Sequence, residues 1–235
     1  MIDDVTLEIV AELSPTDWLV GFDEVGRGSW AGPLVVGAAA IQVASLEKFF
    51  EDNFKRFVDD SKRISRRARD SADLLIRKYF RVGIGSVSHF EIDSFGLAKG
   101  LTEGAKRALS SLGLDGAHSL LLLDGKYDYL EAGDSKVVTI VGGDRKSAVI
   151  ASASVVAKVF RDRVMVDLDD EYPFWNFASN VGYPSPRHRA SIGIFGLSAI
   201  HRRSWSFARP FLDCATIPPL EIFEDAQMIL FEQNL

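Results

Sequence analysis

The chain has 235 residues, of which 47% are hydrophobic and 26% are charged, and it contains one cysteine. This composition excludes intrinsic disorder, collagen-like repeats and a fold that depends on disulfides or on a cysteine-rich zinc site. No stretch approaches the ~18 consecutive apolar residues of a transmembrane helix, and the start of the chain lacks the basic region of a secretory signal. We therefore expect a cytoplasmic protein with no membrane segment.

The net charge of −6 is unevenly distributed along the chain. Residues 1–17 and 210–235 each carry five acidic residues and no basic one, which leaves 27 basic and 23 acidic residues in 18–209. A slightly positive body suits a polyanionic partner, although a charge of this size is equally typical of a solvated surface. We expect three parts: an acidic N-terminal segment (1–17), one folded domain (18–209) and an acidic C-terminal extension (210–235).

The apolar pattern predicts strands that alternate with helices. Short apolar or β-branched runs predict strands at 18–22, 32–43, 81–88, 119–123 and 136–141. Helical spacing predicts helices at 64–80, with Ser65 as an N-cap, at 89–112, interrupted by glycines, from about 145 to about 170, and within the tail. This alternation is typical of an α/β sheet with helices on its faces.

Acidic residues stand at the ends of three predicted strands. Asp23 and Glu24 follow the first strand, Asp124 follows the fourth, and Asp144 lies between the fifth strand and the long helix. The ends of neighbouring strands lie within ~5–10 Å of one another, so these carboxylates would raise each other's pKa unless a divalent cation neutralised them. Oxygen ligands suit Mg²⁺ or Mn²⁺, and two such ions can hydrolyse a phosphodiester.

Taken singly, each acid also has an ordinary structural explanation. Asp144 suits a helix cap, Asp124 suits a turn, and the pair Asp23-Glu24 suits a loop that faces water. The prediction of a site therefore depends on several of these acids lying close together at one edge of the sheet.

Motifs in the chain resemble, in order, those of the ribonuclease HII family. They are Asp23-Glu24-Val25-Gly26-Arg27-Gly28 with Ala31-Gly32-Pro33, Asp60-Ser61-Lys62, Leu123-Asp124-Gly125, Gly143-Asp144-Arg145-Lys146-Ser147, the segment 151–163, Tyr172-Pro173, Gly182-Tyr183 and Ile200-His201-Arg202-Arg203-Ser204. The resemblance covers about 18–207, and several motifs in the correct order are far more specific than one glycine-rich match.

The resemblance implies a ribonuclease H-like α/β fold, in which helices flank a mixed five-stranded sheet, with a C-terminal helical extension. It implies an endonuclease, with 18–209 as its catalytic domain, that cleaves the RNA strand of RNA–DNA hybrids, and nothing in the sequence demands more than a monomer. It also implies nicking of ribonucleotide-containing duplex DNA on the 5′ side of a single embedded ribonucleotide, which leaves a 3′-hydroxyl and a 5′-phosphate.

The resemblance also assigns roles to individual residues. The catalytic, metal-binding acids are Asp23, Glu24, Asp124 and Asp144, and the cofactor is Mg²⁺ or Mn²⁺. The expected substrate-binding residues are Gly26, Arg27, Gly28, Lys62, Lys146 and Tyr183.

Physical arguments support these substrate-binding roles, but each residue also has an ordinary structural explanation. Glycines at Gly26 and Gly28 let the backbone approach the ribose 2′-hydroxyl, although a tight turn also needs glycine. Tyr183 would pack against the deoxyribose next to the ribonucleotide, where a flat ring selects a sugar without a 2′-hydroxyl, although it also suits a packed loop aromatic. The basic residues are candidate phosphate contacts.

Some positions depart from the family pattern or have two interpretations. Asn180-Val181 stands where the family has two cations, and Trp30 stands where a smaller residue is usual. The basic residues Lys158, Arg161 and Arg163 and the run His201-Arg202-Arg203 suit either phosphate contacts or structural roles. The acidic tail would repel phosphates, so we expect it to pack against the body.

Three other functions agree less well with the residues. Ribonuclease HIII needs an N-terminal substrate-binding domain, and only about 17 residues precede the first strand here. The four acids argue against a non-catalytic nucleic-acid-binding module, because carboxylates beside phosphate weaken binding. A small-molecule metal phosphohydrolase would not explain the Gly-Arg-Gly turn together with the tyrosine loop.

Overall fold

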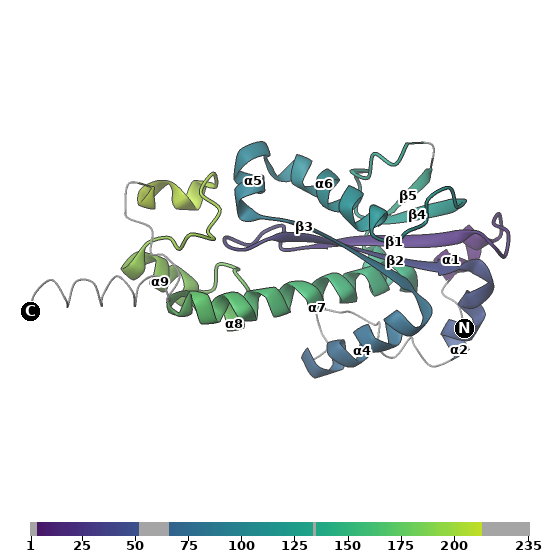
Figure 1. The fold of residues 1–235 in the computed structure, drawn as a ribbon, viewed down its shortest axis with the longest axis horizontal. Helices are drawn as coiled ribbons and strands as arrows, with labels where there is room; N and C mark the ends of the chain where they lie inside the picture. The colour runs from purple at the N-terminus through teal and green to yellow at the C-terminus, as the bar shows by residue number, and fades with distance from the viewer. Residues whose placement is uncertain (1–3, 52–65, 134, 213–235) are drawn as a thin grey trace, which may run out of the picture. The chain divides into compact units, whose positions relative to one another are not determined.

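The computed structural model describes residues 4–51, 66–133 and 135–212 (Figure 1). The strands are β1 (Trp18–Val25), β2 (Leu34–Gln42), β3 (Arg81–Val87), β4 (Ser119–Asp124) and β5 (Lys136–Ile140). The α-helices are α1 (Asp4–Val10), α2 (Leu46–Glu51), α4 (Arg66–Tyr79), α5 (His89–Phe95), α6 (Leu97–Ser110), α7 (Ala148–Glu171), α8 (Phe177–Asn180) and α9 (Pro186–Phe195). Short 3₁₀ turns are η1 (Val43–Ser45), η2 (Gly143–Arg145), η3 (Pro173–Trp175) and η4 (Ser206–Phe211).

The strands form one mixed five-stranded sheet in the order β3-β2-β1-β4-β5. β1, β2 and β3 pair antiparallel, whereas β1, β4 and β5 pair parallel. The expected mixed sheet is therefore confirmed, and β1 lies at its centre with β4 running beside it in the same direction.

By contacts between residues, the chain divides into two compact units. The first unit comprises 1–25, 34–87 and 98–160 and contains the sheet; the second comprises 26–33, 88–97 and 161–235. Among the described residues, no helix has the length and apolar character needed to cross a membrane.

In the first unit, helices cover both faces of the sheet (Figure 1). α6 packs on one face against Val20, Phe22 and Leu121, and α4 and α7 pack on the other with Leu19 and Leu122. α7 lies very close to β2. A methyl group added at Gly37 would stand only 2.5 Å from the carbonyl oxygen of Ala153. β1 and β4 are buried on both faces, and because successive side chains of a strand point to opposite faces, each strand contributes to both cores.

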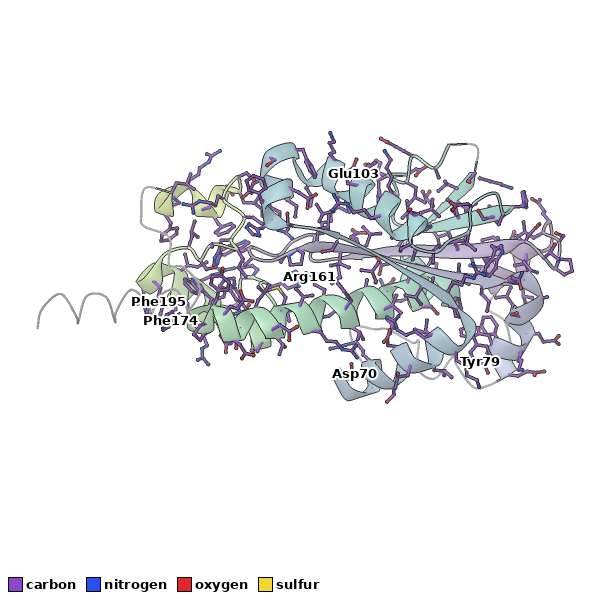
Figure 2. The ribbon with its side chains drawn as sticks, viewed as in Figure 1. Asp70, Tyr79, Glu103, Arg161, Phe174 and Phe195 are labelled. Carbon is purple, nitrogen blue, oxygen red and sulfur yellow. The ribbon has the colours of Figure 1, made fainter. Side chains whose placement is uncertain are left out.

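The core of the second unit is rich in aromatic side chains. Its buried members include Met165, Tyr172, Trp175, Phe177, Ile192 and Ile200. Phe174 and Phe195 stack beside each other at its partly exposed edge, with ring centroids 4.8 Å apart (Figure 2).

The predicted strands agree with the structure except at their ends, whereas one predicted helix is divided and the short helices α1, α2, α8 and α9 were not predicted. β1 continues to Val25, so Asp23 and Glu24 lie inside the strand rather than after it. The predicted helix 89–112 is two helices, because Gly96 has a φ of 86°, which ends α5. Ser65, Lys62 and the predicted tail helix lie outside the described residues.

Candidate active site

Asp23 and Asp124 occupy equivalent positions on neighbouring parallel strands. Phe22 of β1 pairs with Leu123 of β4, and each aspartate is the next residue along its strand. Because alternate residues share a face, both carboxylates lie on the face that α7 covers. The sheet register therefore brings together two of the predicted acids.

The carboxyl group of Asp23 is almost completely buried, with 6% of the residue exposed. Burial raises the pKa of Asp23 to about 7, a hydrogen bond with Ser154 of α7 opposes this, and the charges of Glu24 and Asp124 add to the increase. Its Oδ1 accepts the backbone N–H of Glu24 at 2.8 Å. The negative charge of Asp23 thus has less stabilisation than it would have in water.

A glycine turn after β5 connects Asp124 with the residues around Asp144. Gly142 has a left-handed backbone (φ 65°, ψ 41°), and the N–H of Gly143 donates to Oδ1 of Asp124 at 2.6 Å. A methyl group added at Gly143 would stand 2.5 Å from Cδ1 of Ile150 and 3.3 Å from that same oxygen. Glycine is therefore required for the close approach that places Asp144 one residue from the contact.

The side chain of Asp144 is 11% exposed and lies 3.9 Å from Nε of Arg145. Lys146, two residues further on, is exposed. The predicted phosphate contact at Lys146 is thus accessible, whereas Lys62 lies outside the described residues.

Glu24 follows Asp23 on β1 and therefore projects from the opposite face of the strand. Its Oε2 accepts a hydrogen bond from the hydroxyl of Tyr129 at 3.2 Å. Burial, followed by the charges of Glu24 and Asp23, raises the pKa of Tyr129 far above its usual range, so this hydroxyl stays a donor. No sequence pattern singles out Tyr129, which lies 105 residues from Glu24.

The donor set at this sheet edge is chemically suited to a hard divalent cation. All the candidate side chains offer carboxylate oxygens, and Asp23, Glu24 and Asp124 are close enough for their charges to interact. In the part of the chain that the structure describes, no three acidic, histidine or cysteine side chains converge as a ready-made metal cage. The residues thus fit Mg²⁺ or Mn²⁺ by ligand type, with Glu24 held by Tyr129 on the other face of β1.

The turn Gly26–Gly28, which is predicted to contact the ribose and is called the sugar-reading loop below, lies at the start of the second unit. Gly26 has a φ of 85°, a value that favours glycine, and its N–H donates to the hydroxyl of Tyr183 at 3.1 Å. Arg27 and Gly28 are exposed, and a methyl group added at Gly28 would lie 3.9 Å from the ring of Tyr183. The structure therefore brings Tyr183 together with the Gly-Arg-Gly turn.

Two buried arginines hold the main chain of this loop. Arg161 donates to the carbonyl oxygens of Pro33 and Ala31 at 2.8 and 3.2 Å, and to the hydroxyl of Ser29 at 2.9 Å. Arg202 donates to the carbonyl oxygens of Arg27 at 3.0 Å and of Gly26 at 2.6 Å. Burial, then the charge of Arg161, lowers the pKa of Arg202 to about 9.

The alternative interpretations of these basic residues can now be decided. Of the two roles considered for Arg161 and Arg202, the structural one agrees with the structure, because both arginines are fully buried. His201 is fully buried as well. The sequence alone could not decide between the two roles, because the partners are remote in sequence, 176 residues away for Arg202 and Gly26.

The two departures from the family pattern also have structural explanations. Trp30 stacks on Phe207 at 4.1 Å, at the edge of the aromatic core of the second unit. Asn180 donates to the carbonyl oxygen of Trp175 at 2.6 Å and accepts the N–H of Gly182 at 2.7 Å, so it shapes the loop before Tyr183.

The sheet order, with aspartates near the carboxyl ends of the parallel strands β1 and β4, defines a ribonuclease H-like fold, and solved structures share it. The ribonuclease H2 of Pyrococcus horikoshii OT3 matches with a TM-score of 0.66 and 26% identity, over 83% of this chain and 96% of that one. The ribonuclease HII of Archaeoglobus fulgidus, solved in complex with PCNA, matches with a TM-score of 0.65 and 26% identity, over 80% and 95% of the two chains.

Sequence comparison identifies the family. The family model of ribonuclease HII matches residues 20–208. The ribonuclease HII of Streptomyces griseus is 40% identical over 193 residues, which are 80% of this chain and 77% of the relative. The chain belongs to the ribonuclease HII family.

Proposed function

We propose that the protein is a metal-dependent endoribonuclease that cleaves the RNA strand of RNA–DNA hybrids. The proposal includes nicking of duplex DNA on the 5′ side of a single embedded ribonucleotide, with a 3′-hydroxyl and a 5′-phosphate as products. The observation that carries it is the position of Asp23 and Asp124, each directly after the last paired residue of two neighbouring parallel strands, in a chain of the ribonuclease HII family. The family match over 20–208 supports 18–209 as the catalytic domain.

Asp23, Glu24, Asp124 and Asp144 would hold the cofactor, Mg²⁺ or Mn²⁺. When bound, two such ions lower the pKa of an attacking water and stabilise the departing 3′-oxygen. The chain's own contribution is to hold the carboxylates in place: Gly143 fixes Asp124, Ser154 contacts Asp23, and Tyr129 fixes Glu24.

We assign recognition of the sugar to Gly26, Arg27, Gly28 and Tyr183. Because Arg202 already engages the carbonyl oxygens of Gly26 and Arg27, the loop keeps a fixed shape before substrate arrives. The exposed Arg27 and Lys146 are proposed phosphate contacts, and Lys62 is a further one. We propose that the enzyme acts as a monomer in the cytoplasm.

The proposal is tested by cleavage of three labelled duplexes with Mg²⁺ or Mn²⁺: one containing a single ribonucleotide, one RNA–DNA hybrid and one all-DNA duplex. We expect cleavage of the first two, with the nick 5′ to the ribonucleotide, and loss of cleavage with a chelator. Asp23→Asn and Asp124→Asn should abolish turnover but retain substrate binding, whereas the exposed Asp115→Asn serves as the matched control. Near-normal turnover by either of the first two variants would contradict the assignment of the acids.

A further inference from the structure

Two fully buried histidines lie next to the Tyr183 loop and have no role in the proposed chemistry. His188 belongs to the first half of α9, and His201 follows that helix and forms an isolated β-bridge with Ala31. Aromatic rings surround the pair: Phe177 lies edge-on to His188 at 5.4 Å, and Trp175 lies 5.9 Å from His201. Burying two polar rings in such a core is unfavourable unless their nitrogens are hydrogen-bonded.

The two imidazoles form one continuous hydrogen-bonded chain that ends on Tyr183. Nδ1 of His201 lies 2.9 Å from the backbone nitrogen of Ser198 and 2.7 Å from its hydroxyl. Nε2 of His201 lies 3.0 Å from Nε2 of His188. Nδ1 of His188 lies 2.8 Å from the carbonyl oxygen of Tyr183.

The hydrogen-bond partners at the two ends of this hydrogen-bonded series fix where the protons of the two rings lie, and the two requirements agree. The backbone N–H of Ser198 can only donate, so Nδ1 of His201 accepts and its Nε2 carries the proton. The carbonyl oxygen of Tyr183 can only accept, so Nδ1 of His188 carries its proton and its Nε2 accepts. The link between the two rings is then a donor facing an acceptor, and each neutral ring has one permitted tautomer.

Both histidines favour the neutral form, which the hydrogen-bonded series from Ser198 to Tyr183 requires. Burial lowers the pKa of His188, and burial together with the charge of His188 lowers the pKa of His201 to about 3. An additional proton on either ring would set one N–H against another.

Tyr183 is fixed at both of its ends. Its carbonyl oxygen accepts from His188, while its hydroxyl accepts the N–H of Gly26, the first residue of the sugar-reading loop. The guanidinium of Arg161 lies 5.5 Å from the centre of its ring. A shift of the Tyr183 main chain would therefore move the ring away from Gly26 and Gly28.

We propose that His188 and His201 are positioning residues that set substrate preference through Tyr183. By holding the main chain of Tyr183, they keep its ring against the Gly26–Gly28 turn, where it selects a deoxyribose beside the ribonucleotide. The pair thereby raises the preference for a single embedded ribonucleotide over a continuous RNA–DNA hybrid. This inference rests on the proposed function for its substrate readout.

Two near-isosteric variants of His188 separate positioning from simple packing. The amide nitrogen of His188→Asn can take the place of Nδ1 and keep the bond to Tyr183, whereas the longer side chain of His188→Gln places its amide near Nε2 and loses that bond. We expect the Asn variant to retain the ratio of kcat/KM for the two substrates. The Gln variant should lower this ratio about tenfold, the range expected for one lost buried hydrogen bond.

A second measurement does not depend on activity. Hydrogen exchange at the amide of Gly26 reports whether the Tyr183 hydroxyl remains in place, because that hydroxyl is its acceptor. We expect clearly faster exchange in His188→Gln and only slightly faster exchange in His188→Asn, which keeps the bond to Tyr183 but loses the link to His201. His201→Asn, which breaks the link between the rings but leaves Nδ1 of His188 in place, should have a smaller effect and provides a test if the Gln variant does not fold.

The outcomes distinguish this inference from the proposed function. If the wild type cleaves neither substrate, the proposed function fails, and the exchange at Gly26 still decides whether the histidines position Tyr183. Unchanged exchange and an unchanged substrate ratio in His188→Gln and His201→Asn would overturn the inference. An undiminished effect of His188→Gln in a Tyr183→Ala background would overturn it too, because Tyr183 would not be the intermediary.

Discussion

Ionisation of the buried carboxyl group of Asp23 should lower the free energy of unfolding. Its pKa is about 7 in the folded chain, mainly through burial, against an ordinary value of 3.8. The folded state therefore binds the proton more tightly than the unfolded state, and stability falls as the pH rises from about 4 through about 7. The penalty is fully present at pH 8 and absent at pH 4.

We predict that Asp23→Asn stabilises the metal-free protein at pH 8 by roughly 4 kcal/mol, because the pKa of Asp23 is raised from 3.8 to about 7 and each unit of pKa corresponds to about 1.4 kcal/mol. The gain should disappear near pH 4, where the wild-type carboxyl is protonated. Urea unfolding with a chelator at both pH values measures this, with Asp115→Asn as the exposed control. An equal gain at both pH values would show that the charge is not the cause.

Tyr129 should affect metal affinity through Glu24. Its hydroxyl donates to a carboxylate oxygen of Glu24, and outer partners of this kind orient metal ligands. We predict that Tyr129→Phe weakens Mn²⁺ binding about tenfold, as measured by calorimetric titration of the substrate-free protein. Tyr127→Phe is the matched control, since Tyr127 is 80% exposed, and an equal loss in both variants would count against the role of Tyr129.

At the residue scale, the sequence indicates the acids better than the residues that support them. Asp23, Asp124 and Asp144 end apolar runs or precede a helix, so the local pattern marks them. Tyr129 and His188 have no local signal, because their roles arise from partners that only the folded chain brings near. The roles of the predicted acids and of Tyr183 themselves remain predictions.

At the scale of elements, substitution of two glycines that both lie inside regular elements should change the stability of the protein in opposite directions. Gly37 of β2 lies under α7, and an added methyl group would stand 2.5 Å from the carbonyl oxygen of Ala153 and 2.9 Å from Cβ of Ala157. Gly193 lies in α9, is exposed, and has nothing within 4 Å of an added methyl group.

We predict that Gly37→Ala destabilises the protein by about 3 kcal/mol, the range of overpacking a tight core. Gly193→Ala should stabilise it by about 0.5–1 kcal/mol, because alanine favours a helix. Thermal unfolding of both variants gives the comparison. A neutral Gly37→Ala would mean that α7 can move away from the sheet without loss.

The strands were predictable because each is a short apolar run bounded by polar or glycine residues. Their pairing follows from the resemblance to a known fold rather than from the pattern itself. The break of 89–112 at Gly96 and the short turn Gly143–Arg145 could not be placed from spacing, because a glycine in a helical pattern is compatible with both a continuous and a broken helix.

At the scale of the whole molecule, buried histidines should make the protein sensitive to acid. The pKa of His201 is lowered to about 3, mainly by burial and then by His188, with His89 and Arg203 adding repulsion. In the unfolded chain a histidine titrates near 6.5, so between about 6.5 and 3 the unfolded state binds more protons. The stabilisation is fully present above about pH 6.5 and is lost as the pH falls towards 3.

We predict that the free energy of unfolding falls more steeply between pH 6.5 and 4 in the wild type than in a His188→Asn, His201→Asn double variant. Urea unfolding across that range measures both slopes, and the carboxylates common to both proteins cancel in the comparison. Equal slopes would show that the imidazoles titrate normally in the folded state.

The arginines beneath the Gly26–Pro33 segment have a consequence for how such an enzyme can change over evolution. Arg161 and Arg202 hold the segment mainly by its carbonyl oxygens, and every amino acid supplies that group whatever its side chain. The outward-facing Arg27 can therefore be exchanged while the curve of the backbone persists. The proposed contact of residue 27 with the substrate backbone can thus change in evolution or be redesigned at the surface, while the main chain that carries it stays the same.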